Sequence, residues 1–292
     1  MERLADAHEL LDGPLDAAQL AGNLRDLTRV NRLLGGAELS WRALRLALGA
    51  SFRGHATLLD VGTGAADIPR YLARRGTASG LTLHITATDV RSEIVDVARE
   101  RSAGTARLSV DHAADMSQVP DDSYDVVHAS LLLHHLEPGP AGELLGEMGR
   151  VARRAVIVND LDRARRWWLA AWLLSRIAPR HRYTRNDAPL PVRRAYRPNE
   201  LSALAAGAGL REIGRLRDRL GHRYVLVLRP ATRTAVARWA AGTRSRSRSR
   251  SWAVARLVQR WLRDWRLTAT RSPSSNGCRG HAGGRAGSTR RR

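Results

Sequence analysis

Residues 57–72 constrain the fold of this chain more than any other stretch. A short apolar run carries Asp60, two glycines follow at Gly62 and Gly64, and an amphipathic helical pattern then begins. This order predicts a buried strand, a tight turn and a helix. The two glycines allow the backbone to approach a ligand closely, and the N-terminus of the helix directs its amides at that ligand. The stretch therefore predicts a strand–turn–helix unit that binds a ligand.

The spacing of the glycines argues against a dinucleotide. A dinucleotide fingerprint requires a glycine at position 67, where this chain has Asp67. An additional carboxylate is a poor neighbour for a pyrophosphate. Asp60 lies two residues before the first glycine and suits a ligand that carries a cationic ammonium group. A glycine turn after a strand can also be purely structural, so the turn alone leaves both interpretations open.

The stretch resembles motif I of the Rossmann-like S-adenosylmethionine-dependent methyltransferases, whose pattern is acid-x-glycine-x-glycine-x-glycine. Asp60, Gly62 and Gly64 match the pattern, and Ala66 replaces the third glycine. The resemblance implies that Asp60, Gly62, Thr63 and Gly64 bind S-adenosylmethionine as cofactor. It covers residues 56–160 closely and residues 1–230 loosely.

Strand and helix patterns alternate after this unit. The expected strands cover residues 81–89, 107–110, 124–129 and 155–158, with helical patterns between them. Strands and helices alternating at this spacing predict an α/β fold, with a doubly wound, mostly parallel sheet and right-handed crossovers. Further strand patterns at 212–216 and 224–228 predict an antiparallel hairpin at the edge of the sheet.

The chain divides into three predicted regions. Residues 1–50 form a helical preface that either covers the pocket as a lid or packs on the edge of the sheet. Residues 51–230 form the methyltransferase domain, in which a helix and loop at 161–198 are expected to cover the acceptor site. Residues 231–292 are an Arg/Ser-rich, low-complexity tail, disordered or partly helical.

The charge of the chain is concentrated in this tail. Sixteen Arg and one Asp lie in residues 233–292, so that +15 of the formal charge of +21 belongs to this segment and +6 to residues 1–232. The tail is either a dispensable extension, a basic Trp-bearing helix in peripheral contact with a membrane, or a nonspecific RNA contact. Because the rest of the chain is only mildly basic, a nucleic-acid partner is not expected.

Cysteine content and hydropathy exclude other classes of protein. Cys278 is the only cysteine, which excludes an internal disulfide and a multi-cysteine metal cluster, and we expect no metal site. The longest purely apolar run, residues 167–174, is far shorter than the roughly 20 residues of a membrane-spanning helix. The N-terminus lacks the basic and apolar regions of a signal peptide. We therefore expect a cytoplasmic protein.

The resemblance assigns further donor-binding residues at the ends of the next strands. Asp89 would bind the ribose hydroxyls, and Val90 would pack on the adenine ring. The adenine amino group would contact Asp115, and Ser130 would lie near the methionine end of the donor. Ala114 and Met116 would flank the adenine ring. Each acid alone is also typical of a solvated loop, but acids at successive strand ends converge on one sheet edge.

A second segment indicates the branch of the family. Residues 121–127 followed by 132–136 resemble the ubiquinone/menaquinone methyltransferase-like branch, which acts on small molecules. The Asn/Asp-Pro-Pro-Tyr signature of many nucleic-acid and protein N-methyltransferases is absent after the fourth strand. This absence favours an oxygen or carbon acceptor.

Two histidines and a group of aromatic and polar residues are the candidates for catalysis and acceptor binding. His134 or His135 could act as a general base, although a histidine at a strand–helix junction is equally often structural. The candidates for acceptor binding are Trp168, Trp172, Tyr183, Arg185 and Asp187. The tryptophans could instead pack in the core, and the three polar residues could belong to an ordinary surface loop.

The predicted function is methyl transfer from S-adenosylmethionine to an oxygen or carbon of a small acceptor. A hydrophobic aromatic, polyketide or quinone-like acceptor fits the tryptophan-rich segment and the family resemblance. Two alternatives remain open at this point: an RNA methyltransferase that uses the basic tail, and a non-catalytic S-adenosylmethionine-binding partner protein on the same fold.

Overall fold

The computed structural model describes the region that carries the predicted sheet. The described residues are 1–4, 22, 24, 25, 28, 35–113, 115–177 and 190–231. Most of the helical preface, the polar loop of the acceptor region and the Arg/Ser-rich tail lie outside them. The proposed contacts of the tail with a membrane or RNA therefore stay predictions.

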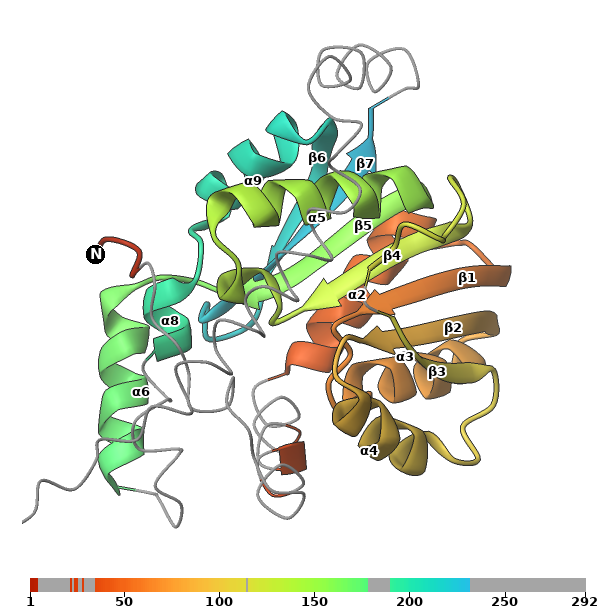
Figure 1. Ribbon diagram of the computed structural model, residues 1–292, viewed down its shortest axis with the longest axis horizontal. Helices are drawn as coiled ribbons and strands as arrows, with labels where there is room; N and C mark the ends of the chain where they lie inside the picture. Colours follow the sequence, from red (N-terminus) through yellow and green to blue (C-terminus); the bar gives the residue numbers. More distant parts are fainter. Residues whose placement is uncertain are drawn as a thin grey trace, which may run out of the picture.

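A seven-stranded sheet forms the centre of the described residues (Figure 1). The strands are β1 (Gly54–Val61), β2 (Leu81–Asp89), β3 (Leu108–His112), β4 (Tyr124–Ser130), β5 (Ala152–Leu161), β6 (Leu210–Arg217) and β7 (Arg223–Pro230). Their order across the sheet is β3-β2-β1-β4-β5-β7-β6. The first five strands are parallel and follow the doubly wound Rossmann order.

The antiparallel hairpin predicted at the edge of the sheet is present. Strand β7 runs antiparallel to both β5 and β6, so β7 is an inner strand and only β6 forms the edge. Because β7 is reversed, its first residue, Arg223, lies beside Leu161 at the end of β5. The hairpin thus brings the start of β7 to the edge where the parallel strands end.

Helices cover both faces of the sheet. They are α2 (Gly36–Leu48), α3 (Asp67–Ala78), α4 (Ser92–Ser102), the short 3₁₀ helix η2 (Leu133–His135), α5 (Pro138–Val151), α6 (Arg165–Ile177), α8 (Leu190–Arg194) and α9 (Pro198–Gly207). Figure 1 shows α5 and α9 over one face, with α3 and α4 over the other. Helix α2 contacts α3, β5 and β7 on the second face.

The alternation of side chains along the strands divides the core into two layers. Leu58 packs with α2 and α3 on one face, and its neighbour Leu59 packs with α5 on the other. Both residues are buried. Because both faces are covered, the inner strands read as nearly continuous apolar runs, which is the pattern from which the parallel sheet was predicted.

Asp125 ties the beginnings of three strands together. One of its carboxylate oxygens accepts hydrogen bonds from the backbone N–H and the hydroxyl of Thr57, at 2.9 and 3.2 Å. The other accepts from Arg153 at 2.9 Å. Burial alone would raise the pKa of Asp125, but the bonds from Thr57 and Arg153 together hold it below its ordinary value of 3.8.

Replacing Asp125 with alanine is therefore expected to lower the free energy of unfolding at pH 7 by about 1–3 kcal/mol, because the N–H of Thr57 loses its acceptor. The folded-state pKa is depressed, so this stabilisation is present above the unfolded pKa near 3.8 and is lost as the pH falls through the lower folded pKa. Urea unfolding at pH 7 and pH 3 measures both effects. Asp96→Ala on α4, where the side chain is 75% exposed, is the control. Equal destabilisation at both pH values would contradict the prediction.

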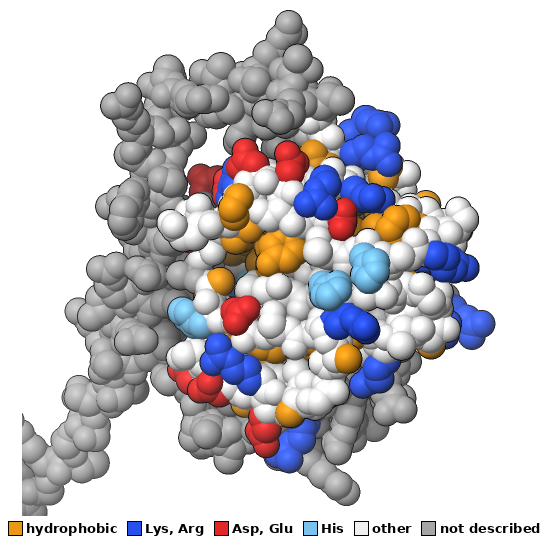
Figure 2. Space-filling view, turned by 90° about the vertical axis from the view of Figure 1, so that its right-hand side faces the viewer, with side chains coloured by type: hydrophobic (Ala, Val, Ile, Leu, Met, Phe, Trp, Pro, Cys, Tyr) orange, Lys and Arg blue, Asp and Glu red, His pale blue; other side chains and the backbone are white. Residues whose placement is uncertain are grey.

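Charged side chains are mixed on the molecular face shown in Figure 2. Arginine side chains, several of them close together at the upper right of Figure 2, lie among acidic, histidine and hydrophobic side chains on this face. Within the described ranges, none of the helices has the length and apolar character needed to cross a membrane.

Candidate functional site

The turn between β1 and α3 has the backbone conformation that glycine favours. Gly62 and Gly64 have φ values of +68° and +55°. A Cβ atom on Gly62 would also lie 2.9 Å from a methyl group of Leu132, which packs over the turn from the end of β4. Ala66, which replaces the third glycine of the sequence pattern, adopts φ +53°. The left-handed conformation costs a non-glycine residue about 1–2 kcal/mol, so the surrounding turn holds Ala66 under strain.

Asp89 connects the end of β2 to this turn. Its side chain is 8% exposed, and its two oxygens accept hydrogen bonds from the backbone N–H groups of Gly64 and Arg91, each at 3.1 Å. Burial raises the pKa of Asp89 above its ordinary value, although the bonds from Arg91 and Gly64 oppose this effect. A carboxylate has more acceptor positions than these two bonds use. Asp89 can therefore hold the glycine turn and still accept hydrogen bonds from ligand hydroxyls.

The ends of β2 and β3 lie side by side next to Asp89. The N–H of Ala113 donates to the carbonyl of Asp89 at 3.1 Å. Asp115 follows β3 and accepts hydrogen bonds from the N–H and the hydroxyl of Ser117, at 2.9 and 2.6 Å. Val90 is 36% exposed, which leaves an apolar surface beside Asp89. Met116 is buried, and Ala114 lies outside the described residues.

Asp60 belongs to a buried chain of polar side chains under α2. An oxygen of Asp60 lies 2.5 Å from Nδ1 of His128 on β4, and Nε2 of that histidine lies 2.9 Å from Oγ of Ser40. Asn159 on β5 donates its amide to the same hydroxyl at 2.8 Å. All four side chains are buried.

One tautomer of the neutral His128 ring satisfies all of these contacts. In this tautomer Nδ1–H donates to Asp60, and Nε2 accepts the hydroxyl proton of Ser40, whose oxygen accepts from Asn159. Sequence reasoning did not identify His128, Ser40 or Asn159 as partners of Asp60, because these contacts depend on the register between strands.

His134 forms a buried pair with Asp160. Nδ1 of His134 lies 2.7 Å from one oxygen of Asp160, and the backbone N–H of His134 donates to the other oxygen at 3.1 Å. Burial tends to raise the pKa of Asp160, but the charge and hydrogen bond of His134 outweigh it and hold this pKa below its ordinary value. The ring of His135 lies 4.2 Å from that of His134. Asp160 fixes the orientation of the His134 ring and leaves Nε2 as the free nitrogen.

Two buried hydroxyls at the same edge have no hydrogen-bond partner among the described residues. They are Oγ1 of Thr63, in the glycine turn, and Oγ of Ser130, at the end of β4. A buried polar group without a partner costs roughly 1–3 kcal/mol. Both residues were predicted to bind the methyl donor, and their free hydroxyls fit a ligand with polar groups on either side of β1.

The structure thus brings the predicted donor-binding residues to one edge of the sheet. Strands β3, β2, β1 and β4 are consecutive neighbours, and Asp115, Asp89, Asp60 and Ser130 lie at or just after their carboxyl ends. Their individual contacts with a ligand stay predictions.

The predicted acceptor-binding residues are less completely placed. Trp168 and Trp172 lie on α6 and are partly buried. Tyr183, Arg185 and Asp187 lie outside the described residues.

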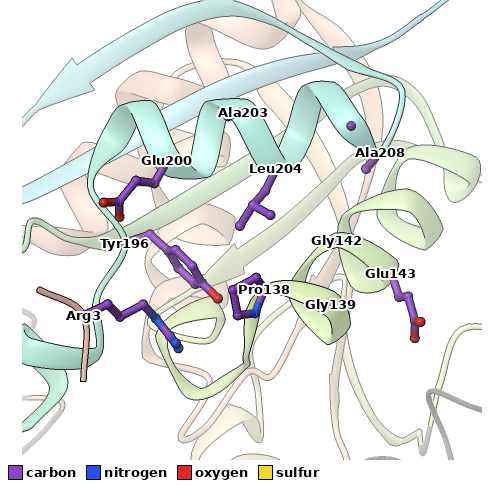
Figure 3. Close-up of a pocket in the computed structure, with 11 residues that line it drawn as sticks. Arg3, Pro138, Gly139, Gly142, Glu143, Tyr196, Glu200, Ala203, Leu204 and Ala208 are labelled. Carbon is purple, nitrogen blue, oxygen red and sulfur yellow. The ribbon is translucent and has the colours of Figure 1, made fainter. Parts of the chain in front are cut away.

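A separate cavity lies between α5 and α9 (Figure 3). Its volume is about 600 Å³, and its lining includes Arg3, Tyr196 and Leu204. The remaining lining residues come from α5, from α9 and from Ala208 directly after α9, and none of the residues predicted to bind donor or acceptor is among them. This cavity is therefore distinct from the cluster at the carboxyl edge of the sheet.

Comparisons with known proteins agree with this geometry. Residues 58–155 match the family described as a methyltransferase domain. A crystal structure of a SAM-dependent methyltransferase from Aquifex aeolicus is similar, with a TM-score of 0.52 and 20% identity, covering 74% of this chain and 98% of that chain. No curated protein has a sequence that matches this chain.

Two further structures have the same fold. Human N-acetylserotonin methyltransferase in complex with SAM gives a TM-score of 0.55 at 18% identity, covering 74% of this chain and 57% of that chain. An O-methyltransferase family protein from Burkholderia thailandensis gives 0.53 at 15% identity, covering 75% of this chain and 61% of that chain. The match with this chain covers less than two thirds of the length of each of these two proteins.

The sheet order and the glycine turn define a Rossmann-like fold, and residues 58–155 match a methyltransferase domain. More particularly, the similar structures include S-adenosylmethionine-dependent methyltransferases, the class that the motif around Asp60 resembles.

Proposed function

We propose that this protein transfers the methyl group of S-adenosylmethionine to an oxygen or carbon atom of a small hydrophobic acceptor, aromatic, polyketide or quinone-like. The observation that carries the proposal is the buried pair formed by His134, which follows β4, and Asp160, which lies near the end of β5. This pair follows Ser130, the residue expected near the methionine end of the donor. A histidine oriented by a carboxylate is suited to removing a proton from a phenol or an enol.

The donor supplies a methyl group that is already activated by the positive charge on sulfur. The main task of the protein is alignment, which can contribute about 7–11 kcal/mol to lowering the barrier. In this proposal the glycine turn and Asp89 hold the nucleoside, and the hydroxyls of Thr63 and Ser130 accept or donate hydrogen bonds along the rest of the donor. His134 takes the acceptor proton on Nε2, while Asp160 stabilises the resulting imidazolium ion.

The acceptor class is supported by three observations. Residues 121–127 and 132–136 resemble the ubiquinone/menaquinone methyltransferase-like branch, which acts on small molecules. Among the similar structures, one is named as an N-acetylserotonin methyltransferase and another as an O-methyltransferase family protein. Trp168 and Trp172, on the partly buried helix α6, offer aromatic surface for an apolar acceptor.

Isotope-labelled S-adenosylmethionine tests the proposal directly. The purified protein is incubated with a metabolite extract and the labelled donor, and mass spectrometry identifies the products that carry the label. Alkylated phenols and quinols are then compared with polar acceptors of similar size, and we expect higher kcat/KM for the first set. Preference for the polar set would contradict the acceptor class. Binding of the donor without any methylated product would favour a non-catalytic role.

A further inference from the structure

Arg223, the first residue of β7, is a buried cation that no described side chain neutralises by direct contact. The residue is 2% exposed, and its Nη1 has no hydrogen-bond partner among the described residues. Burial lowers the pKa of Arg223 to about 10, although the more distant carboxylates of Asp160, Asp67 and Asp218 oppose this effect. A buried charge is normally paired, because desolvation without compensation is costly.

The acidic residues nearest in sequence and space have other partners. Asp160 binds His134 through its side-chain oxygens. Asp218 accepts hydrogen bonds from the backbone N–H groups of Leu220 and Arg223, and it lies 2.6 Å from Nδ1 of His222. Neither carboxylate accepts a hydrogen bond from the guanidinium group of Arg223.

The guanidinium group lies against the N-terminus of α2. A Cβ atom on Gly36, the first residue of that helix, would lie 1.6 Å from Nη1 of Arg223. Only glycine at this position lets the guanidinium group approach the helix so closely. The N-cap residue, Gly35, supplies no side-chain hydrogen bond to the first amides of α2.

Two positive groups therefore meet, and among the described residues no carboxylate forms a hydrogen bond or ion pair with the guanidinium group of Arg223. Glu38, in the first turn of α2, accepts a hydrogen bond from Tyr71 instead. The N-terminus of a helix carries roughly half a positive charge and attracts anions, so a cation beside it is electrostatically unfavourable. A side chain placed there for stability alone would be expected to carry the opposite charge. The arrangement becomes favourable once an anion accepts hydrogen bonds from both the guanidinium group and the first amides of the helix.

From this arrangement we infer that Arg223 and the first amides of α2 bind a carboxylate group of a ligand at the carboxyl edge of the sheet. The planar guanidinium group matches a carboxylate in geometry as well as in charge. The position is connected to the donor site, because Asn159, in the chain that leads to Asp60, also donates to the carbonyl of Gly36 at 2.9 Å. The inference rests on the proposed function, which places two ligands at this edge.

Either ligand can supply the carboxylate. S-adenosylmethionine carries one on its amino-acid end, and an acceptor can carry one beside its methylated oxygen or carbon. Two matched pairs of probes distinguish these sources. S-adenosylhomocysteine is compared with its decarboxylated analogue, and 4-hydroxybenzoate is compared with 4-hydroxybenzamide.

Calorimetric titration of the full chain and of Arg223→Met provides the test. We expect Arg223→Met to weaken binding of the carboxylate member of one pair by tenfold or more, with less than a twofold change for its neutral partner. Loss with S-adenosylhomocysteine assigns the donor carboxylate, and loss with 4-hydroxybenzoate assigns the acceptor carboxylate. Arg223→Lys should retain part of the preference. No selective loss in either pair would overturn the inference.

Thermal unfolding separates this role from a structural one. Methionine has a similar length and no charge, so without ligand Arg223→Met is expected to unfold at the same temperature as the wild type or higher. A large decrease in unfolding temperature without ligand, together with equal losses for both members of each pair, would show that Arg223 is structural.

A glycine substitution gives a second, independent variant. Gly36→Ala keeps the charge of Arg223 but displaces its guanidinium group, so it should reproduce the selective loss. Gly142→Ala on α5, where an added Cβ meets nothing within 4 Å, is the matched control and should bind all four probes like the wild type. If the wild type does not bind S-adenosylhomocysteine, the proposed function fails, and the hydroxybenzoate pair alone then decides the role of Arg223.

Discussion

Replacing His134 with alanine is expected to lower kcat by about 10²–10⁴-fold while leaving the dissociation constant of S-adenosylhomocysteine almost unchanged. The ring is buried and is held by Asp160 through both Nδ1 and the backbone N–H. It belongs to the short helix η2 after β4, so its loss removes the proposed base without disturbing the glycine turn. Single-turnover kinetics on a methylated acceptor, with calorimetry for donor binding, measures the two effects separately.

Asp160→Asn tests the orientation of the same ring. An amide can present its N–H to Nδ1 of His134, which stabilises the wrong tautomer and directs the ring proton to Nε2. The expected result is a loss of kcat of similar size to that of His134→Ala, and the double variant should lose little more than either single variant. Simple additivity of the two losses would show that the residues do not act as a unit.

His135→Ala is the matched control for His134. Both residues lie in η2 and their rings are 4.2 Å apart, but the carboxylate of Asp160 binds the ring of His134. We therefore expect His135→Ala to lose less than tenfold in kcat. If His135→Ala is the inactive variant and His134→Ala keeps wild-type turnover, the base is His135.

The fold was predictable because its inner strands are covered on both faces. The apolar runs around Leu58 and Val156 mark β1 and β5, and their alternation with helical patterns predicts the parallel sheet. The ends of β5 were missed. The prediction covered residues 155–158, whereas the strand runs from Ala152 to Leu161. Its ends carry polar residues, whose place in a strand depends on partners elsewhere, such as Asp125 for Arg153 and His134 for Asp160.

The helix that follows β2 shows a similar limit. Because serine favours the N-cap position, the sequence alone predicts Ser92 as its N-cap. In the structure Arg91 is the N-cap and Ser92 is the first helical residue. Asp89 accepts the N–H of Arg91, so the buried carboxylate at the end of β2 orders the residue that begins the helix.

The position of each site residue along its own strand was predictable, but its contacts with residues on neighbouring strands were not. A residue at the end of a parallel strand must lie at the carboxyl edge, which placed Asp60, Asp89 and Ser130 together. The partners of these residues depend on register and on the side chains of neighbouring strands. His128 faces Asp60 because the two residues are register partners across β1 and β4. Arg223 reaches the same edge only because β7 is antiparallel.

Asp89→Ala is expected to weaken binding of S-adenosylhomocysteine by at least 100-fold. The substitution removes the acceptor for the N–H groups of Gly64 and Arg91, and hydrogen bonds to a charged group contribute about 1.5–3 kcal/mol each. It also removes the proposed contact with the ribose hydroxyls. Titration calorimetry at pH 7.5 gives the change in affinity. Asp111→Asn, an exposed acid on the neighbouring strand β3, is the control and should bind like the wild type.

The pH dependence of binding and stability provides a second measurement on Asp89. Because its folded-state pKa lies above the ordinary value of 3.8, the folded protein binds this proton more tightly than the unfolded chain. Its contribution to stability is therefore present below the unfolded pKa and is lost as the pH rises through the folded pKa. Ligand binding should show the opposite trend, because the charged carboxylate accepts hydrogen bonds from the ribose hydroxyls. The affinity of the wild type for the ligand should therefore fall as the pH is lowered through the folded pKa. Asp89→Asn should abolish that fall. If Asp89→Ala binds S-adenosylhomocysteine as tightly as the wild type, neither the turn nor the nucleoside depends on this carboxylate.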